Sequence, residues 1–257
     1  VQVDRYLDGD VAATLRLLVN AVQAAGPDAA AVDKRRAHWT AAHDARMEAA
    51  AQLLTRTLAN SAGENAIDPG LVCAALGNGL SDDAIYVDET ITYRGAILNH
   101  LNWEQPQSYY RTYGGLGQAI GTALGVKFAA RDRTVVALMG DGTFMYNPML
   151  QALAFSRNQD LPVLTVIFNN GGYDAMKKEH HAFYPDGISA DHDIYPGFAV
   201  TGLNYEELAV PFGGFGRRVE KAGDLEAAIA DAQAALADGK SAILNVMTAA
   251  TGSPLGV

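Results

Sequence analysis

Two short polar segments of this sequence have the residue types that bind a phosphate and a divalent cation. The first is Gly140-Asp141-Gly142, which directly follows the apolar run 134–139. Two glycines around an acid allow a sharp turn and let a phosphate approach main-chain N–H groups. A carboxylate at the end of a strand can bind a hard cation, and a following helix would present its N-terminus to an anion.

The second segment is Asn169-Asn170-Gly171-Gly172-Tyr173, which follows the apolar run 162–168. If the two runs are adjacent parallel strands, Asp141 and the asparagines lie at the same edge of the sheet. A carboxylate, an amide oxygen and a main-chain carbonyl form an oxygen-only set suited to Mg²⁺ on a diphosphate. Because Gly-Asp-Gly alone is also an ordinary turn, the pairing of the two segments carries this prediction.

The elements that would position these segments follow from the hydrophobic pattern. Short apolar runs predict strands at 84–87, 134–139, 162–168 and 242–246, and helical spacing predicts helices at 70–80, 115–130, 146–157, 173–182 and 224–237. This alternation predicts an α/β fold, a parallel sheet covered by helices on both faces. Ligands of such folds bind beyond the carboxyl ends of the strands. The stretches 8–25 and 31–62 predict an N-terminal helical extension.

Composition narrows the class of protein. The 257 residues are 49% hydrophobic and 19% charged, as in a globular protein, and the net charge of −10 argues against a nucleic-acid or anionic-membrane partner. A single cysteine, Cys73, excludes a disulfide framework or a multi-cysteine cluster within this chain. With no run of 18 apolar residues and no signal peptide, we expect a cytoplasmic protein.

Longer segments resemble a known enzyme family. GDGTFMYNPMLQALAFSRNQDLPVLTVIFNNGGY resembles the thiamine-diphosphate motif, in which GDG is followed by NN at a slightly shorter distance. IDPGLVCAALGNGLSDDAIYVDET and YGGLGQAIGTALG resemble segments of the diphosphate-binding domain in the acetolactate-synthase and 2-oxo-acid-decarboxylase family, which includes benzoylformate decarboxylases. The resemblance covers residues 66–250 and implies the thiamine-diphosphate-binding fold. It also implies a decarboxylase or carboligase that uses thiamine diphosphate and Mg²⁺.

The resemblance implies roles for single residues. Asp141, Asn170 and the carbonyl of Gly172 would bind Mg²⁺. Leu116 would be the apolar wedge beneath the cofactor, and the carbonyl of Gly114 would accept a hydrogen bond from its aminopyrimidine group. The other residues expected to bind the cofactor are Glu89, Thr90, Thr92, Gly140, Gly142, Thr143 and Tyr173. Gly121 departs from the pattern because the family often has proline there, and the extra residues between GDG and NN are expected within TFMYNPM.

The family's spacing also suggests a substrate side. It places Ala175, Met176 and Glu179 on the helix after the second polar segment. Some decarboxylases of the family carry an acid at the position of Met176, and methionine cannot handle a proton, which leaves carboligation open. His180 is a possible proton donor because histidine titrates near neutrality. Simpler interpretations are core packing for Met176 and a solvated surface for Glu179 and His180.

Residues 1–65 read as the tail of another domain plus connecting helices, because VQVDRYLDGDVAATLRLLVNAV resembles the last strand and helix of the family's middle domain. Residues 66–257 would form the diphosphate-binding domain. The family's activating glutamate lies on a separate α/β domain, for which residues 5–62 are too helical. We therefore expect a split or cleaved enzyme, in line with a chain that starts at Val1. A second polypeptide in a heterodimer or heterotetramer would supply the pyrimidine-binding domain and the glutamate, and the substrate would be a small 2-oxo acid or aldehyde.

Two alternatives remain open at this point. The chain could be the cofactor-binding subunit of a 2-oxo-acid oxidoreductase, although such subunits bring cluster-binding cysteines and Cys73 alone cannot hold a cluster. It could also be a non-catalytic subunit that keeps the cofactor fold, against which the intact set of Asp141, Asn170 and Leu116 argues.

Overall fold

A computed structural model describes residues 4–60, 66–101, 103, 105–112, 114–200 and 202–249. The chain divides into two compact units, Val1–Ala51 and Gln52–Val257. None of the helices described is long and apolar enough to cross a membrane.

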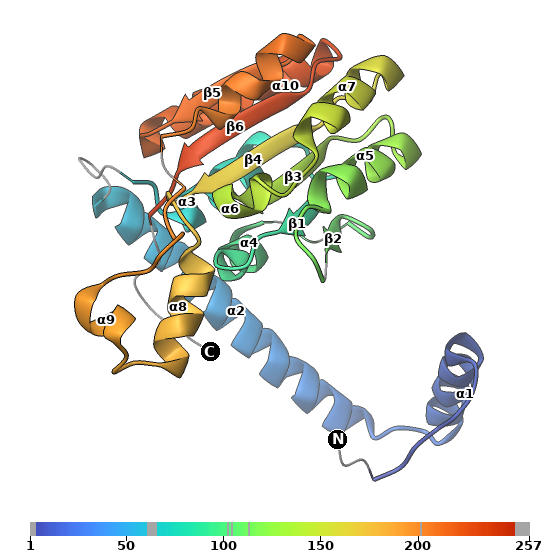
Figure 1. Cartoon of the computed structure of the whole chain (residues 1–257). Coiled ribbons are helices and arrows are strands. Elements are labelled where there is room, and N and C mark those ends of the chain that lie inside the picture. The colour runs from blue at the N-terminus through green and yellow to red at the C-terminus, as the bar shows by residue number, and fades with distance from the viewer. Residues whose placement is uncertain are drawn as a thin grey trace. The chain divides into compact units, whose positions relative to one another are not determined.

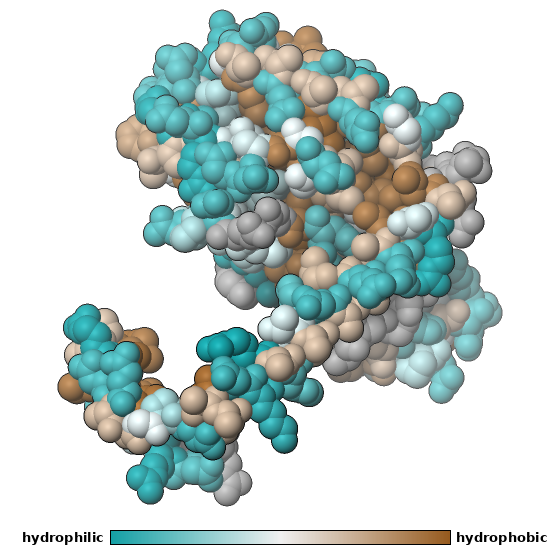
Figure 2. Space-filling view, turned by 180° about the vertical axis from the view of Figure 1, so that it is seen from behind, coloured by the Kyte–Doolittle hydropathy of each residue, from teal (hydrophilic) through white to brown (hydrophobic). Residues whose placement is uncertain are grey.

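The first unit contains α1 (Val11–Ala24) and most of α2 (Ala29–Asn60). Each helix begins at an aspartate cap, since the Asp10 carboxylate accepts a hydrogen bond from the Ala13 N–H and Asp28 caps α2 in the same way. No side chain of α1 is buried, and Figure 2 shows apolar and polar surface side by side on this part of the chain. The two helices confirm the predicted helical extension, while residues 1–3 of the expected strand lie outside the described residues.

The second unit is built on one six-stranded sheet with the order β2-β1-β3-β4-β6-β5, in which every neighbouring pair is parallel (Figure 1). The strands are β1 (Ile85–Glu89), β2 (Tyr109–Arg111), β3 (Val135–Gly140), β4 (Leu164–Asn169), β5 (Phe215–Val219) and β6 (Ala242–Met247). Every residue of β1 and β4 is buried, as expected for strands covered on both faces.

Helices pack on both faces of this sheet and confirm the predicted fold class (Figure 1). One buried cluster contains side chains of α3 (Pro69–Gly79), α4 (Arg94–His100) and α10 (Leu225–Ala237). The other contains side chains of α5 (Ala119–Ala129), α7 (Met149–Gln159) and the 3-10 helix η1 (Tyr205–Phe212). The remaining short helices are α6 (Asp141–Phe144), α8 (Asp174–Phe183), α9 (Ile188–His192) and η2 (Ala222–Asp224).

The strand order places a switch point next to the Gly-Asp-Gly segment. From β1 the chain moves to β2 on one side and then to β3 on the other, so the connections leave the carboxyl ends of β1 and β3 in opposite directions. Such a switch point leaves a crevice where ligands of open α/β sheets bind. Glu89 and Gly140 are the last residues of these two strands.

Some predicted boundaries are wrong, and both edge strands are absent from the sequence prediction. β2 has only three residues, and β5 contains a glycine and two arginines, so neither shows a buried-strand pattern. The helix predicted over 115–130 begins only at Ala119 because Gly117 has φ +99°.

Candidate active site

Asp141 lies where β3 meets α6, at the switch point. Gly140 pairs with Phe168 of β4, so the segments that follow the two strands leave the sheet side by side, as predicted. Asp141 is only 2% exposed, and its Oδ1 accepts a hydrogen bond of 2.9 Å from the Gly142 N–H. Its Oδ2 is buried without a hydrogen-bond partner among the described residues. A buried oxygen of this kind is normally satisfied by a group absent from the bare protein.

Burial raises the pKa of the Asp141 carboxyl to about 6, because the low-dielectric surroundings disfavour the ionised form. The N–H groups of Gly142, Gly171 and Gly172 partly offset this effect by favouring the carboxylate. Asp141 therefore faces the loop after β4, and a bound cation would stabilise its ionised form further.

The loop after β4 is held in a fixed conformation. Gly171 adopts a left-handed conformation with φ +80°, and its N–H donates to Oδ1 of Asn169. The carbonyl of Gly171 accepts from Val200 N, and Tyr173 N donates to the carbonyl of Phe198. A Cβ on Gly172 would lie 2.6 Å from that carbonyl, so the loop has no room for a side chain there.

The two asparagines point to different parts of the fold. Asn169 is buried and starts a polar chain, because its Nδ2 donates to Oδ1 of Asn245 and Asn245 Nδ2 donates to Oε2 of Glu206. Asn170 instead donates to the hydroxyl of Tyr93 and accepts from Gly172 N at 3.2 Å. One asparagine thus ties the loop to β6 and η1, while the other ties it to Tyr93, which follows β1.

Gly142 and Tyr173 are in close contact, since a Cβ on Gly142 would lie 2.6 Å from the Tyr173 ring. Thr143 is buried, and its hydroxyl reaches the carbonyl of Glu89 at 3.5 Å. Gly140 has room for a Cβ, with neighbours only at 4.0 Å. The GDG turn therefore needs its second glycine for packing against the loop after β4.

If this site binds the thiamine diphosphate that the resemblance predicts, replacing Gly142 with alanine should lower the affinity for that cofactor by roughly tenfold, about 1.4 kcal/mol, because the Tyr173 ring must move away from the turn. Gly121→Ala is the matched control, since a Cβ there meets nothing within 4 Å and alanine favours the helix. Isothermal titration with Mg²⁺ and thiamine diphosphate measures both variants. Equal affinities of the two variants would contradict the packing role of Gly142.

The segment after β1 has a strong structural role. Both carboxylate oxygens of Glu89 accept main-chain N–H groups at the start of α5, from Gln118 and Ala119, and Oε2 also accepts Nδ2 of Asn147. Thr90 donates both its N–H and its hydroxyl to Oδ1 of Asp88. Contacts of Glu89, Thr90 and the half-buried Thr92 with a diphosphate stay a prediction.

The segment Gly114–Gly117 precedes α5 and is open to solvent at its first three residues. Gly114 has φ +97° and Gly117 has φ +99°, conformations that favour glycine. Leu116 is 39% exposed, which leaves an apolar side chain free to contact a ligand. Its expected role as a wedge stays a prediction.

The residues predicted on the substrate side lie on α8. Ala175 is half-buried, while Met176 is 53% exposed and Glu179 is exposed. Core packing is therefore wrong for Met176 in this chain by itself. His180 is exposed, with its ring 5.4 Å from that of Tyr184 and 5.7 Å from that of Tyr195.

Two tyrosines that sequence reasoning missed also belong to this region. Tyr205 is 5% exposed, and its hydroxyl is buried without a hydrogen-bond partner among the described residues. Burial, with smaller contributions from the charges of Asp141 and Tyr173, raises the pKa of Tyr205 to about 12. Tyr93 follows β1 and contacts Asn170, and burial raises its pKa as well. Both hydroxyls therefore stay protonated at neutral pH, and no local sequence signal marks either residue.

The donor set fits a hydrated Mg²⁺ ion. Among the described contacts, Asp141 Oδ2 has no hydrogen-bond partner, Asn170 Oδ1 accepts the Gly172 N–H, and the carbonyl of Gly172 accepts only the Asp174 N–H at 3.0 Å. No cluster of three His, Cys, Asp or Glu side chains with metal-binding geometry occurs in the described ranges. The set described above therefore offers a metal the Asp141 carboxylate together with one amide and one main-chain oxygen.

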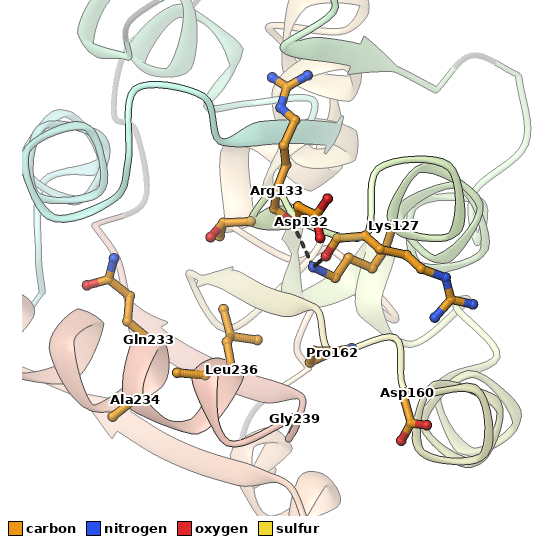
Figure 3. A pocket seen from close by; sticks show the side chains of 12 residues that line it. Lys127, Asp132, Arg133, Asp160, Pro162, Gln233, Ala234, Leu236 and Gly239 are labelled. Carbon is orange, nitrogen blue, oxygen red and sulfur yellow. Dashed lines mark hydrogen bonds between the residues drawn. The ribbon is translucent and has the colours of Figure 1, made fainter.

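A hollow of about 740 Å³ lies at the amino ends of the strands, opposite to Asp141 (Figure 3). Its lining includes Thr134 before β3, Pro162 before β4 and Gly239 after α10. The Lys127 ammonium in it donates to the carbonyls of Arg131 and Arg133, at 2.6 and 2.8 Å, and so holds the turn before β3. This hollow is remote from the carboxyl ends where Asp141 lies.

Comparison with known proteins identifies the fold family. A family model described as the thiamine pyrophosphate enzyme C-terminal TPP binding domain matches residues 92–246. Benzoylformate decarboxylase of Pseudomonas aeruginosa is 29% identical over 151 residues, covering 58% of this chain and 27% of that protein. The putative acetolactate synthase large subunit IlvX of Mycobacterium tuberculosis is 37% identical over 102 residues, covering 39% of this chain and 19% of that protein.

A solved structure agrees with the sequence matches. The thiamine diphosphate-dependent 4-hydroxybenzoylformate decarboxylase of Rhodococcus jostii RHA1 superposes with a TM-score of 0.65 and 30% identity, covering 74% of this chain and 34% of that one. The chain thus spans at most 34% of the length of these three relatives. The chain belongs to the thiamine pyrophosphate enzymes and carries their C-terminal cofactor-binding domain.

Proposed function

We propose that this chain is the cofactor-binding part of a thiamine-diphosphate-dependent lyase or carboligase that acts on 2-oxo acids or aldehydes. In this proposal Asp141, Asn170 and the Gly172 carbonyl bind the Mg²⁺ that holds the diphosphate. The observation that carries it is the buried Oδ2 of Asp141 at the switch point, which has no hydrogen-bond partner in the described part of the chain and faces the loop after β4. The relatives named as decarboxylases and acetolactate synthase support the reaction class.

The chain's own groups would bind and orient the cofactor. Main-chain N–H groups around Gly142 and Thr143 form the start of α6 and would approach the diphosphate. The exposed Leu116 would support the cofactor from below, with Gly114 beside it. Bound thiamine diphosphate supplies the carbanion chemistry that cleaves or forms the bond next to a carbonyl group.

We further propose that a second polypeptide supplies the pyrimidine-binding domain and the glutamate that protonates the pyrimidine ring. The described part of the chain contains one α/β sheet, which in this proposal provides the diphosphate side of the site. In the complex of the two chains, the α8 residues that would face the substrate are Ala175, Met176, Glu179 and His180. Turnover of a 2-oxo acid by the purified chain alone, at the rate of the complex, would refute the partner. Co-purification from the native source, with identification of the second chain and a panel of 2-oxo acids and aldehydes, defines the reaction.

Thiamine diphosphate should stabilise the purified chain only when Mg²⁺ is present. At a ligand concentration of 100 times the dissociation constant, the expected gain is about 2.7 kcal/mol. Thermal unfolding with cofactor plus Mg²⁺, with cofactor plus EDTA, and with Mg²⁺ alone measures it. An equal gain in EDTA would contradict the metal-bridged mode of binding.

An iron assay on the purified complex addresses the oxidoreductase alternative, which requires stoichiometric iron.

A further inference from the structure

Tyr93 connects three segments at the carboxyl edge of the sheet. It follows β1, is 3% exposed, and its ring stacks on Phe168 with centroids 5.4 Å apart. Its hydroxyl oxygen lies 2.8 Å from Asn170 Nδ2 and 3.0 Å from the Ala249 carbonyl oxygen. Thr248 Oγ1 is a third neighbour at 3.3 Å. The hydroxyl therefore joins the switch point, the loop after β4 and the end of β6.

The direction of these hydrogen bonds is fixed by chemistry. A hydroxyl has one hydrogen, and the carbonyl of Ala249 can only accept, so the Tyr93 hydrogen goes to that carbonyl. The hydroxyl oxygen is then an acceptor towards its other neighbours, and it needs the NH₂ end of the Asn170 amide. If the amide were flipped, two oxygens without a hydrogen between them would face each other.

The opposite end of the amide is thereby directed to the metal side. Oδ1 of Asn170 accepts the Gly172 N–H at 3.2 Å. The Asn170 oxygen thus points towards Gly172, whose carbonyl is another ligand of the proposed Mg²⁺ site. Groups that bind the far side of a metal ligand set its orientation and its affinity for the metal.

We propose that Tyr93 is a positioning residue for the metal site: its hydroxyl locks the Asn170 amide with Oδ1 towards the cation. The proposal rests on the proposed function, because it assigns Tyr93 to the Mg²⁺ site described there. In the absence of the hydroxyl, the Asn170 amide keeps, among the described contacts, only the hydrogen bond from the Gly172 N–H at 3.2 Å, and its orientation is held less firmly. Binding of the metal must then also order the side chain that binds it, and the lost side-chain entropy lowers the affinity.

Titration of Mg²⁺ at a fixed, saturating concentration of thiamine diphosphate tests this role with the full chain. In Tyr93→Phe the Mg²⁺ concentration at half-saturation should rise 10–100-fold, as found for other groups behind metal ligands. Thr248→Val removes only the 3.3 Å contact and should raise it less than Tyr93→Phe does. Binding is followed by calorimetry, so that no turnover is needed.

Ser156→Ala is the control for deletion of a buried hydroxyl. Ser156 is 3% exposed, donates to the Leu161 carbonyl at 2.8 Å, and lies on α7 near the amino end of β4. Its loss should leave the Mg²⁺ titration unchanged while lowering thermal stability. Superimposable Mg²⁺ curves for wild type and Tyr93→Phe would overturn the inference but not the proposed function. No Mg²⁺-dependent binding by the wild type would overturn both.

Discussion

Asp141→Asn is expected to weaken binding of thiamine diphosphate with Mg²⁺ by at least 100-fold and, at pH 7, to make the cofactor-free protein more stable. The loss of affinity follows because the only carboxylate of the proposed metal set becomes neutral. The gain in stability follows because the wild-type protein must bury a charge without its counter-ion. A pKa raised from 3.8 to about 6 corresponds to about 3 kcal/mol of unfavourable burial at pH 7, an upper limit because the new NH₂ group needs a partner.

The pH dependence gives the prediction a definite sign. Because the folded-state pKa of Asp141 lies above the unfolded value, the folded protein binds the proton more tightly between pH 3.8 and about 6. The wild type therefore loses stability relative to Asp141→Asn as the pH rises through this window. The part of the stability difference that comes from ionisation of Asp141 should be small below pH 4 and complete above pH 7.

Urea unfolding at several pH values, with and without cofactor, measures both effects. With saturating cofactor and Mg²⁺ the wild type should become more stable than Asp141→Asn, because only the wild type gains the binding free energy. Asp160→Asn is the matched control, since Asp160 is exposed and its left-handed conformation is one that asparagine tolerates. Wild-type affinity in Asp141→Asn would remove Asp141 from the metal set.

The sequence alone predicted the central strands, and it predicted that the polar segments at the ends of two of them lie close together. β3 and β4 are apolar runs bounded by turn residues, and a parallel pair brings Asp141 next to the segment after Asn169. The predicted first strand ended at Val87, whereas β1 continues through Asp88 and Glu89. A charged residue predicts a strand end unless its partners are known. Those partners, Tyr109, Gln118 and Ala119, lie 21 to 30 residues away.

Local sequence patterns did not predict the buried polar residues that support the site, for the same reason. Asn245 lies in β6 and is fully buried, yet it is satisfied by Asn169 and Glu206, 76 and 39 residues away in sequence. Tyr93 depends on Asn170 and Ala249 in the same way. Local patterning predicts which residues are buried, while a long-range contact decides what a buried polar group bonds.

The largest expected loss of stability is that of Glu89→Ala, roughly 2–4 kcal/mol, measured without cofactor. Glu89 and Asn147 together satisfy the first N–H groups of α5, because Asn147 Oδ1 also accepts the N–H of Ile120. Alanine would leave the buried N–H of Ala119 without its acceptor and would leave Asn147 Nδ2 with only the Thr143 carbonyl among the described acceptors. The melting temperature should fall by roughly 5–15 °C.

Glu226→Ala is the matched control, a glutamate in the first turn of α10 that is exposed to solvent. It should lose at most about 1 kcal/mol, the value of a charge near a helix N-terminus. The comparison separates two roles of Glu89. If Glu89 only contacted the diphosphate, its replacement would lower cofactor affinity and leave the cofactor-free protein as stable as Glu226→Ala. If Glu89 caps α5, its replacement lowers the stability of the cofactor-free protein. Cofactor affinity then falls only because α5 and the preceding Gly114–Gly117 segment lose their anchor to β1.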